Sequence, residues 1–185
     1  MNQIDRARAT VPAFAQALAV HEAGDLAAAR AAYLDLIDQP QLTGLCLHHL
    51  GMLAAARGEH RVAADMFIRA LQIDPMPMAY ANLRATQDVI GDTAGATATL
   101  INLGCFLQQH HLQSEAVPVY RMALQRDPLS YPAHANLGTA LAWCGALPEA
   151  AWHLAHALAL WARVQPDFQA LIRQLPAMGK PVWQL

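Results

Sequence analysis

Residues 48–71, HHLGMLAAARGEHRVAADMFIRAL, decide the fold class of this chain. The stretch contains two helix-like segments with a short break between them, and Gly51 lies inside the first segment. Glycine within a helix costs about 1 kcal/mol relative to alanine, so its place there needs a reason. The arrangement returns in residues 134–151, HANLGTALAWCGALPEAA, where Gly138 takes the same place. The repetition predicts a packing requirement shared by successive helix pairs.

Glycine breakers give the repeat its length. Gly24, Gly58 and Gly91 follow one another at spacings of 34 and 33 residues, and Gly145 follows after a longer gap of 54. Before a breaker lies a segment with a Leu-Gly or Leu-small pair; after it come Ala, a bulky residue four positions on, Ala-Leu and Asp-Pro. Self-similarity at a fixed period in this range is the signature of a repeat architecture.

The pattern resembles the tetratricopeptide repeat (TPR), in which Leu-Gly on a first helix is followed by Ala-x3-Phe on a second helix and by a closing Pro. Residues 44–76 show it best, with Leu50-Gly51 and Asp74-Pro75 at the expected places. The resemblance covers residues 10–164 and implies an all-α solenoid of about four to five antiparallel helix pairs. The residues that match the structural repeat positions are Gly51, Gly104, Gly138, Ala63, Phe67, Ala116, Tyr120 and Ala150.

A physical reason for the glycines follows from this register. We expect each of them to let the two helices of a pair approach closely, because it has no side chain at the contact. The alanines would supply the facing small surface, and Phe67, Tyr120 and Leu154 would fill the space beside it. Tight packing would then offset the helix-propensity cost.

The predicted organisation has a lead-in, an array and a C-terminal segment. Helix-like segments at 77–90, 93–109 and 112–126 break the period, so either the middle segment serves two repeats or the array has an odd helix there. We expect a capping helix over 166–175, because a solenoid end exposes an apolar face. The predicted parts are the lead-in 1–9, the array 10–164 (10–43, 44–76, an irregular 77–96, 97–130 and 131–164) and the capping helix and tail 165–185.

Composition and charge exclude several classes of function. A net charge of −2 gives no positive field for nucleic acid or an anionic membrane, and no apolar run is long enough to span a bilayer. Three cysteines without a CxxC motif indicate neither a disulfide framework nor a zinc site. Arg6 and Arg8 before an apolar stretch loosely resemble a signal peptide, but Asp5 and Gln16 interrupt it. We expect a cytoplasmic protein, and the low Lys with high Arg and Ala favours a bacterial source.

No catalytic constellation is visible. Among nine histidines, only His153 and His156 share a helix face, and no carboxylate nearby completes a metal site. GxSxG, HExxH and phosphate-loop motifs are absent from the sequence. We therefore expect a non-enzyme with no cofactor and no metal.

The first helices of a TPR array line a concave groove, and the resemblance implies a peptide site there. The sixth repeat position reads His49, Asn82, Asn102 and Asn136, similar to the asparagine ladder of O-linked N-acetylglucosamine transferases. Asn side chains can bind a peptide backbone because they donate and accept; the alternative is that they bond neighbouring helices. The predicted partner-binding residues are His48, His49, Met52, Met78, Asn82, Asn102, Asn136, Thr139 and Trp143. A register error of one residue would turn these residues into repeat interfaces instead.

The sequence favours a scaffold that binds a neutral or apolar segment of a protein partner. A lysine clamp for acidic peptides is missing, because the one lysine, Lys180, lies outside the array. One alternative is the substrate-recruiting TPR domain of a larger enzyme, a glycosyltransferase or methyltransferase. Another is a self-assembling homo-oligomer with Trp183 or an exposed apolar end as the contact. A stand-alone metalloenzyme is the remotest alternative.

Overall fold

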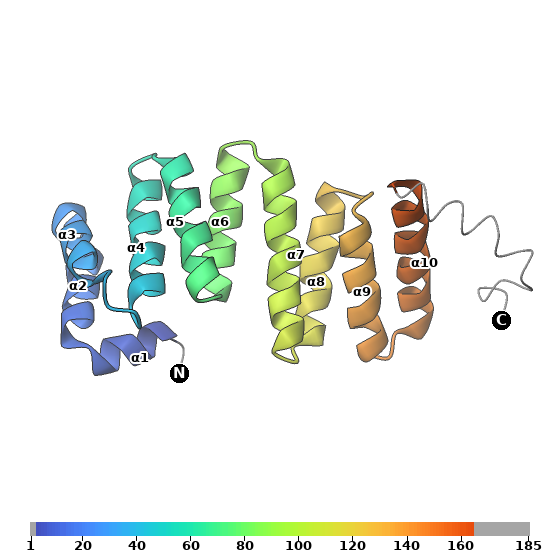
Figure 1. Ribbon diagram of the computed structural model, residues 1–185, viewed down its shortest axis with the longest axis horizontal. Coiled ribbons are helices and arrows are strands. Elements are labelled where there is room, and N and C mark those ends of the chain that lie inside the picture. The colour runs from blue at the N-terminus through green and yellow to red at the C-terminus, as the bar shows by residue number, and fades with distance from the viewer. Residues whose placement is uncertain (1–2, 165–185) are drawn as a thin grey trace, which may run out of the picture. The chain divides into compact units, whose positions relative to one another are not determined.

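A computed structural model describes residues 3–164, which form ten α-helices and contain no strand (Figure 1). The predicted all-α fold class is therefore confirmed for this part of the chain. The predicted capping helix over 166–175 and the tail lie outside the described residues. The helices are α1 (Gln3–Thr10), α2 (Pro12–Glu22), α3 (Leu26–Leu36), α4 (Thr43–Ala56), α5 (His60–Ile73), α6 (Pro77–Val89), α7 (Thr93–Gln109), α8 (Gln113–Arg126), α9 (Tyr131–Trp143) and α10 (Leu147–Val164).

The chain divides into two compact units, residues 1–99 and 100–185, and the division falls inside α7. Within each unit, helices that follow one another in the sequence pack side by side. Unit 1 has its main core among α2, α3 and α4, and unit 2 has its core among α7, α8, α9 and α10. None of the described helices combines the length and the apolar character needed to cross a membrane.

One type of turn joins the two helices of each pair. At Gly24 and Gly58 the backbone enters the left-handed region, with φ of 85° and 77°. The N–H of Gly58 donates to the carbonyl of Ala55, and the next N–H donates to the carbonyl of Ala54, at 3.0 and 2.9 Å. This pair of bonds is the Schellman motif, which satisfies carbonyls at the helix end.

The turn between α7 and α8 is of the same type, but it uses a histidine. His111 has a φ of 61°, its N–H donates to the carbonyl of Gln108, and the N–H of Leu112 donates to the carbonyl of Leu107. His111 precedes Gly145 by 34 residues, so it is the breaker missing from the glycine series. The first part of α7 thus pairs with α6 in unit 1, and its second part pairs with α8 in unit 2.

Close contacts between helices of a pair occur at the three glycines. A Cβ atom added at Gly51 would lie 2.7 Å from Cε1 of Phe67, and one added at Gly138 would lie 2.7 Å from Cγ of Leu154. A Cβ added at Gly104 would overlap the ring of Tyr120. Real Cβ atoms essentially never come within 3.0 Å of another group. No residue with a side chain therefore fits opposite these bulky groups without displacing them.

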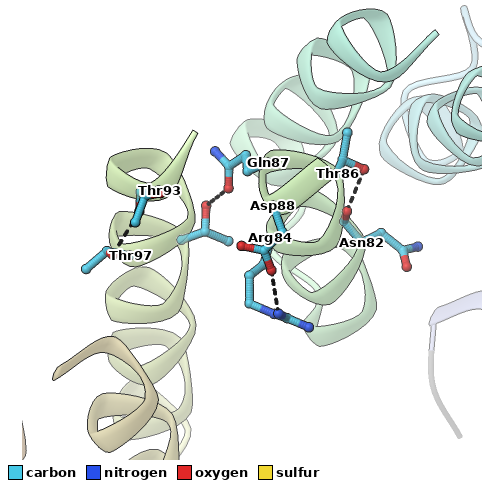
Figure 2. Close-up of polar contacts among 8 residues, drawn as sticks. Asn82, Arg84, Thr86, Gln87, Asp88, Thr93 and Thr97 are labelled. Atoms are coloured by element: carbon cyan, nitrogen blue, oxygen red, sulfur yellow. Dashed lines mark hydrogen bonds and ion pairs between the residues drawn. The ribbon is translucent and has the colours of Figure 1, made fainter. Parts of the chain in front are cut away.

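The contact between α6 and α7 is polar instead (Figure 2). Thr99 donates a hydrogen bond of 2.8 Å from Oγ1 to Oε1 of Gln87, and both side chains are buried. Asp92 caps the start of α7, because its Oδ1 accepts from the N–H of Gly95 at 2.9 Å. A buried hydrogen bond is directional, and either partner left alone would cost about 1–3 kcal/mol. This bond therefore fixes the register of α6 against the first part of α7.

We predict that Gly51→Ala lowers the free energy of unfolding by about 1–3 kcal/mol, although alanine is the better helix former. The cause is overlap with Phe67, so in a Phe67→Ala background the same change should be neutral or stabilising. Urea unfolding followed by circular dichroism measures both legs of this double-mutant cycle. An equal loss in both backgrounds would show that the glycine serves some other purpose.

We further predict that His111→Gly raises the free energy of unfolding of unit 2 by about 1 kcal/mol. A left-handed conformation costs an L-residue roughly 1–2 kcal/mol and costs glycine almost nothing. The reverse exchange at the equivalent turn, Gly145→His, should lower stability by a similar amount. Tryptophan fluorescence in urea reports on this unit, because every tryptophan lies at or beyond Trp143. Destabilisation by His111→Gly would mean that the imidazole itself holds the turn.

Candidate partner-binding faces

A neutral face runs across α7 and α9 in unit 2. The Nδ2 group of Asn136 donates to Sγ of Cys105 at 3.4 Å, which places the two helices side by side. On α9 the spacing of three and four residues brings the exposed side chains onto one side of the helix. We name this surface the α7–α9 face; it consists of Asn102, Cys105, Gln109, Asn136, Thr139 and Trp143.

The α7–α9 face ends in a large exposed aromatic group. The Trp143 side chain is 75% exposed, more than any other large apolar residue of the described chain. Asn102 and Gln109 are also exposed, whereas Cys105 and Asn136 are half-buried. The helices α7 and α9 contain no Asp, Glu, Lys or Arg at all. The surface therefore offers side-chain amides and an apolar ring without any fixed charge.

The three asparagines of the predicted row have different surroundings. Asn102 is exposed, whereas the side-chain amide of Asn136 donates a hydrogen bond to Cys105 of the neighbouring helix. Asn82 is half-buried on α6 of unit 1, and its backbone carbonyl accepts from Thr86 at 2.7 Å. Asn136 thus makes an interhelical bond, which was the alternative to peptide binding, whereas the side chain of Asn102 is exposed.

The two adjacent histidines differ from the expectation for a binding surface. His48 and His49 are 0% and 6% exposed, so a partner cannot reach them. The reason is that α4 packs against α3, α5 and α6 and is buried on nearly every side. At these two positions the side chains therefore pack in repeat interfaces, which was the alternative to partner binding. His48 and His49 are not part of a binding surface.

The two methionines lie on different surfaces of unit 1. Met52 is half-buried against the cluster around Phe67, so it contributes mainly to packing. Met78 is 51% exposed on α6, one turn before Asn82. Unlike α7 and α9, the helix α6 also carries fixed charges, in the ion pair of Arg84 with Asp88.

A histidine cluster joins α9 to α10. His134 and His153 approach to 2.8 Å between their Nδ1 atoms, and Nε2 of His134 lies 3.1 Å from the carbonyl of Pro128. A carbonyl only accepts, so Nε2 of neutral His134 carries the proton and its Nδ1 accepts from His153. Burial, above all, lowers the pKa of both residues, which keeps the pair neutral near pH 7. The arrangement is a structural bridge between the two helices.

No metal centre accompanies these histidines in the part of the chain that the structure describes. Within residues 3–164, no group of three His, Cys, Asp or Glu side chains is placed to hold a metal ion. The ring of His156 stacks on Trp152 at 5.0 Å between centroids and meets the ring of His134 edge-on at 4.6 Å. The cysteines are separate as well: Cys46 is buried, Cys105 is half-buried and Cys144 is exposed.

One member of the α7–α9 face was not in the predicted set. Gln109 is the last residue of α7, and it is exposed beyond Cys105 on the same side of the helix. The sequence signal for it was present: Gln109 occupies in α7 the repeat position that Trp143 occupies in α9.

Comparisons with known proteins give a distant similarity in fold. No protein-family profile matches the sequence, and no curated protein matches it. Among solved structures, the chain is similar to MamA (19% identity, 78% of this chain and 93% of that chain, TM-score 0.41). It is also similar to YrrB, a TPR protein with an unusual peptide-binding site (17% identity, 95% and 98%, TM-score 0.44). A third similarity is to MamA of Desulfovibrio magneticus RS-1 (16% identity, 89% and 98%, TM-score 0.40). These TM-scores lie below 0.5, so the fold assignment rests on the helix pairing described above.

We predict a difference between two asparagines of the α7–α9 face. Asn136→Ala should lower the free energy of unfolding by about 0.5–1 kcal/mol, because it removes the bond to Cys105. The exposed Asn102→Ala should change it by less than about 0.5 kcal/mol. Chemical unfolding of both variants measures this. Equal values for the two changes would argue against the interhelical role of Asn136.

Proposed function

We propose that this protein is a non-catalytic interaction scaffold that binds a neutral, extended peptide segment of a protein partner. The observation that carries the proposal is the absence of fixed charge from α7 and α9, combined with exposed amides and the exposed ring of Trp143. An acidic or basic peptide would lose hydration on such a surface and gain no ion pair there. A neutral peptide avoids this cost.

The amides provide a means of holding a peptide backbone. Each side-chain amide of Asn102 and Gln109 can donate to a carbonyl and accept from an N–H. An extended peptide offers both groups along its length, whereas a helix satisfies its own. We therefore expect an extended chain to be preferred over a helical one on the α7–α9 face.

Trp143 provides the apolar anchor. Exposed tryptophans are enriched among residues that dominate binding energy at protein interfaces. At 75% exposure its ring has most of its surface left to bury. The preferred peptide therefore carries an apolar or aromatic residue at the position that contacts this ring, and neutral residues beside the amides.

We predict that peptides selected from a random displayed library against the whole protein are neutral and contain an apolar anchor. Trp143→Ala should weaken a selected synthetic peptide at least tenfold, and Asn102→Ala should weaken it severalfold. Fluorescence anisotropy of the labelled peptide measures the dissociation constants.

A matched control is Trp152→Ala, which removes another exposed tryptophan, 58% exposed, from α10 outside the face. It should leave the affinity unchanged. Circular dichroism should show that all variants keep their helicity. Equal affinity for the Trp143→Ala and Trp152→Ala variants, or selection of acidic peptides, would contradict the proposed site.

A further inference from the structure

Two adjacent imidazoles lie unpaired in the core of unit 1. His48 and His49 are almost fully buried, and none of their four ring nitrogens has a hydrogen-bond partner in the structure. Leaving a buried donor or acceptor unpaired costs about 1–3 kcal/mol each. Buried polar groups in proteins are nearly always paired, so a pair like this one calls for an explanation.

The imidazoles lie where two helix pairs meet. His49 stacks on Tyr33 of α3, with 5.0 Å between ring centroids and 12° between planes, and it meets Phe14 of α2 edge-on at 5.8 Å. His48 contacts Phe67 of α5 at 5.6 Å between ring centroids and meets the ring of His49 edge-on at 5.3 Å. One residue thus packs on the α2–α3 pair and its neighbour packs inside the α4–α5 pair. The two side chains span the contact between the pairs.

No group that acts on the two imidazoles favours a positive charge there. Glu22 of α2 acts on Tyr33 and favours the charged form of His21, but it is not among the charges that act on His48 or His49. The charges that act on His49 are those of His48 and of His21 from α2, and both oppose its protonation. Tyr33 from α3 and Cys46 from α4 have pKa values raised by burial, to about 11 for Cys46, so both stay neutral in mild acid. The ring of Phe67 from α5 and that of Phe14 from α2 complete the surroundings with apolar groups.

We propose that His48 and His49 form an acid-sensitive joint, at which protonation separates the α2–α3 pair from the α4–α5 pair while unit 2 stays folded. In the closed state, in which the α2–α3 and α4–α5 pairs are in contact, a charged imidazole would be buried among aromatic rings without a counter-charge. In the open state, in which the two pairs are separated, water solvates the charged imidazole. Protons therefore bind the open state in preference, and acid shifts the equilibrium toward it.

The pH range follows from the direction of the pKa changes. Burial, chiefly, lowers the pKa of His48 to about 4 and that of His49 to about 3, from an ordinary value near 6.5. The closed state is thus fully favoured above about pH 6.5 and loses its advantage as the pH falls below it. At pH 5 the opening constant should rise by about 30-fold, because the separation exposes one imidazole, that of His49, while His48 stays against Phe67 inside the α4–α5 pair.

Cys46 reports directly on this opening, because it lies beside the histidines on α4 and is 0% exposed. The test uses the full chain with Cys105→Ser and Cys144→Ser, so that Cys46 is the one thiol. Its labelling by 4,4′-dithiodipyridine is measured between pH 8 and pH 5, and each rate is divided by that of the denatured chain at the same pH. We expect protection of Cys46 to fall at least 30-fold over this range. Unit 2 contains a buried imidazole pair of its own, His134 and His153, next to Trp152, so unfolding of this unit is followed separately by the tryptophan emission maximum, which should keep its native value down to pH 5.

Two variants decide whether the histidines cause the effect. His48→Phe/His49→Phe should keep Cys46 protected down to pH 5, whereas the control His60→Gln in the same unit should behave like the parent. If the double variant fails to fold by circular dichroism, His49→Phe alone, which keeps a ring on Tyr33, should reduce the fall. Constant protection in the parent, an equal fall in the phenylalanine variant, or loss of tryptophan signal together with Cys46 protection would each overturn the proposal.

Discussion

In the pairs α4–α5, α7–α8 and α9–α10, the distance between the two helices is set by a residue without a side chain opposite a bulky one. At Gly51 and Gly104 the bulky partner is an aromatic ring, Phe67 or Tyr120, and at both positions a Cβ would collide with it. These rings are 1% and 0% exposed, so the close approach is what closes the core over them. A glycine inside a helix has a cost of about 1 kcal/mol, which is small beside the burial of an aromatic side chain.

The helix α7 belongs to two pairs, because it makes different kinds of contact with α6 and with α8. The first part of α7 meets α6 through Thr99 and Gln87, and the second part meets α8 through Gly104 and Tyr120. A polar contact and a glycine contact thus lie on successive turns of the same helix. The next turn, at His111, follows Gly91 after only 20 residues, and it precedes the turn at Gly145 by the usual 34 residues. The absence of charge from α7 leaves its remaining side free to form a neutral surface with α9.

Much of the fold was predictable from local pattern, because Leu-Gly, Ala and a bulky residue recur at fixed spacing. The period around residues 77–127 was ambiguous, since a histidine in the left-handed region carries no sequence signal as clear as glycine. The binding positions were harder, because a repeat register does not say which faces of a helix neighbours cover. Thus Trp143 and Asn102 are exposed as expected, whereas His48 and His49 are turned into a core that encloses α4. Asn136 is bonded to Cys105, a contact 31 residues away in sequence that no periodicity reveals.

The most direct test of this account is a nuclear Overhauser measurement on the folded protein. The structure predicts strong cross-peaks from the α-protons of Gly51 to the ring of Phe67 and from those of Gly104 to the ring of Tyr120. Ring currents should also shift these glycine protons away from their usual positions. Gly138, which faces the aliphatic Leu154, should show cross-peaks to methyl protons and no ring-current shift. If the glycine protons of Gly51 and Gly104 show neither ring cross-peaks nor shifts, the helices do not pack through these contacts and the account is wrong.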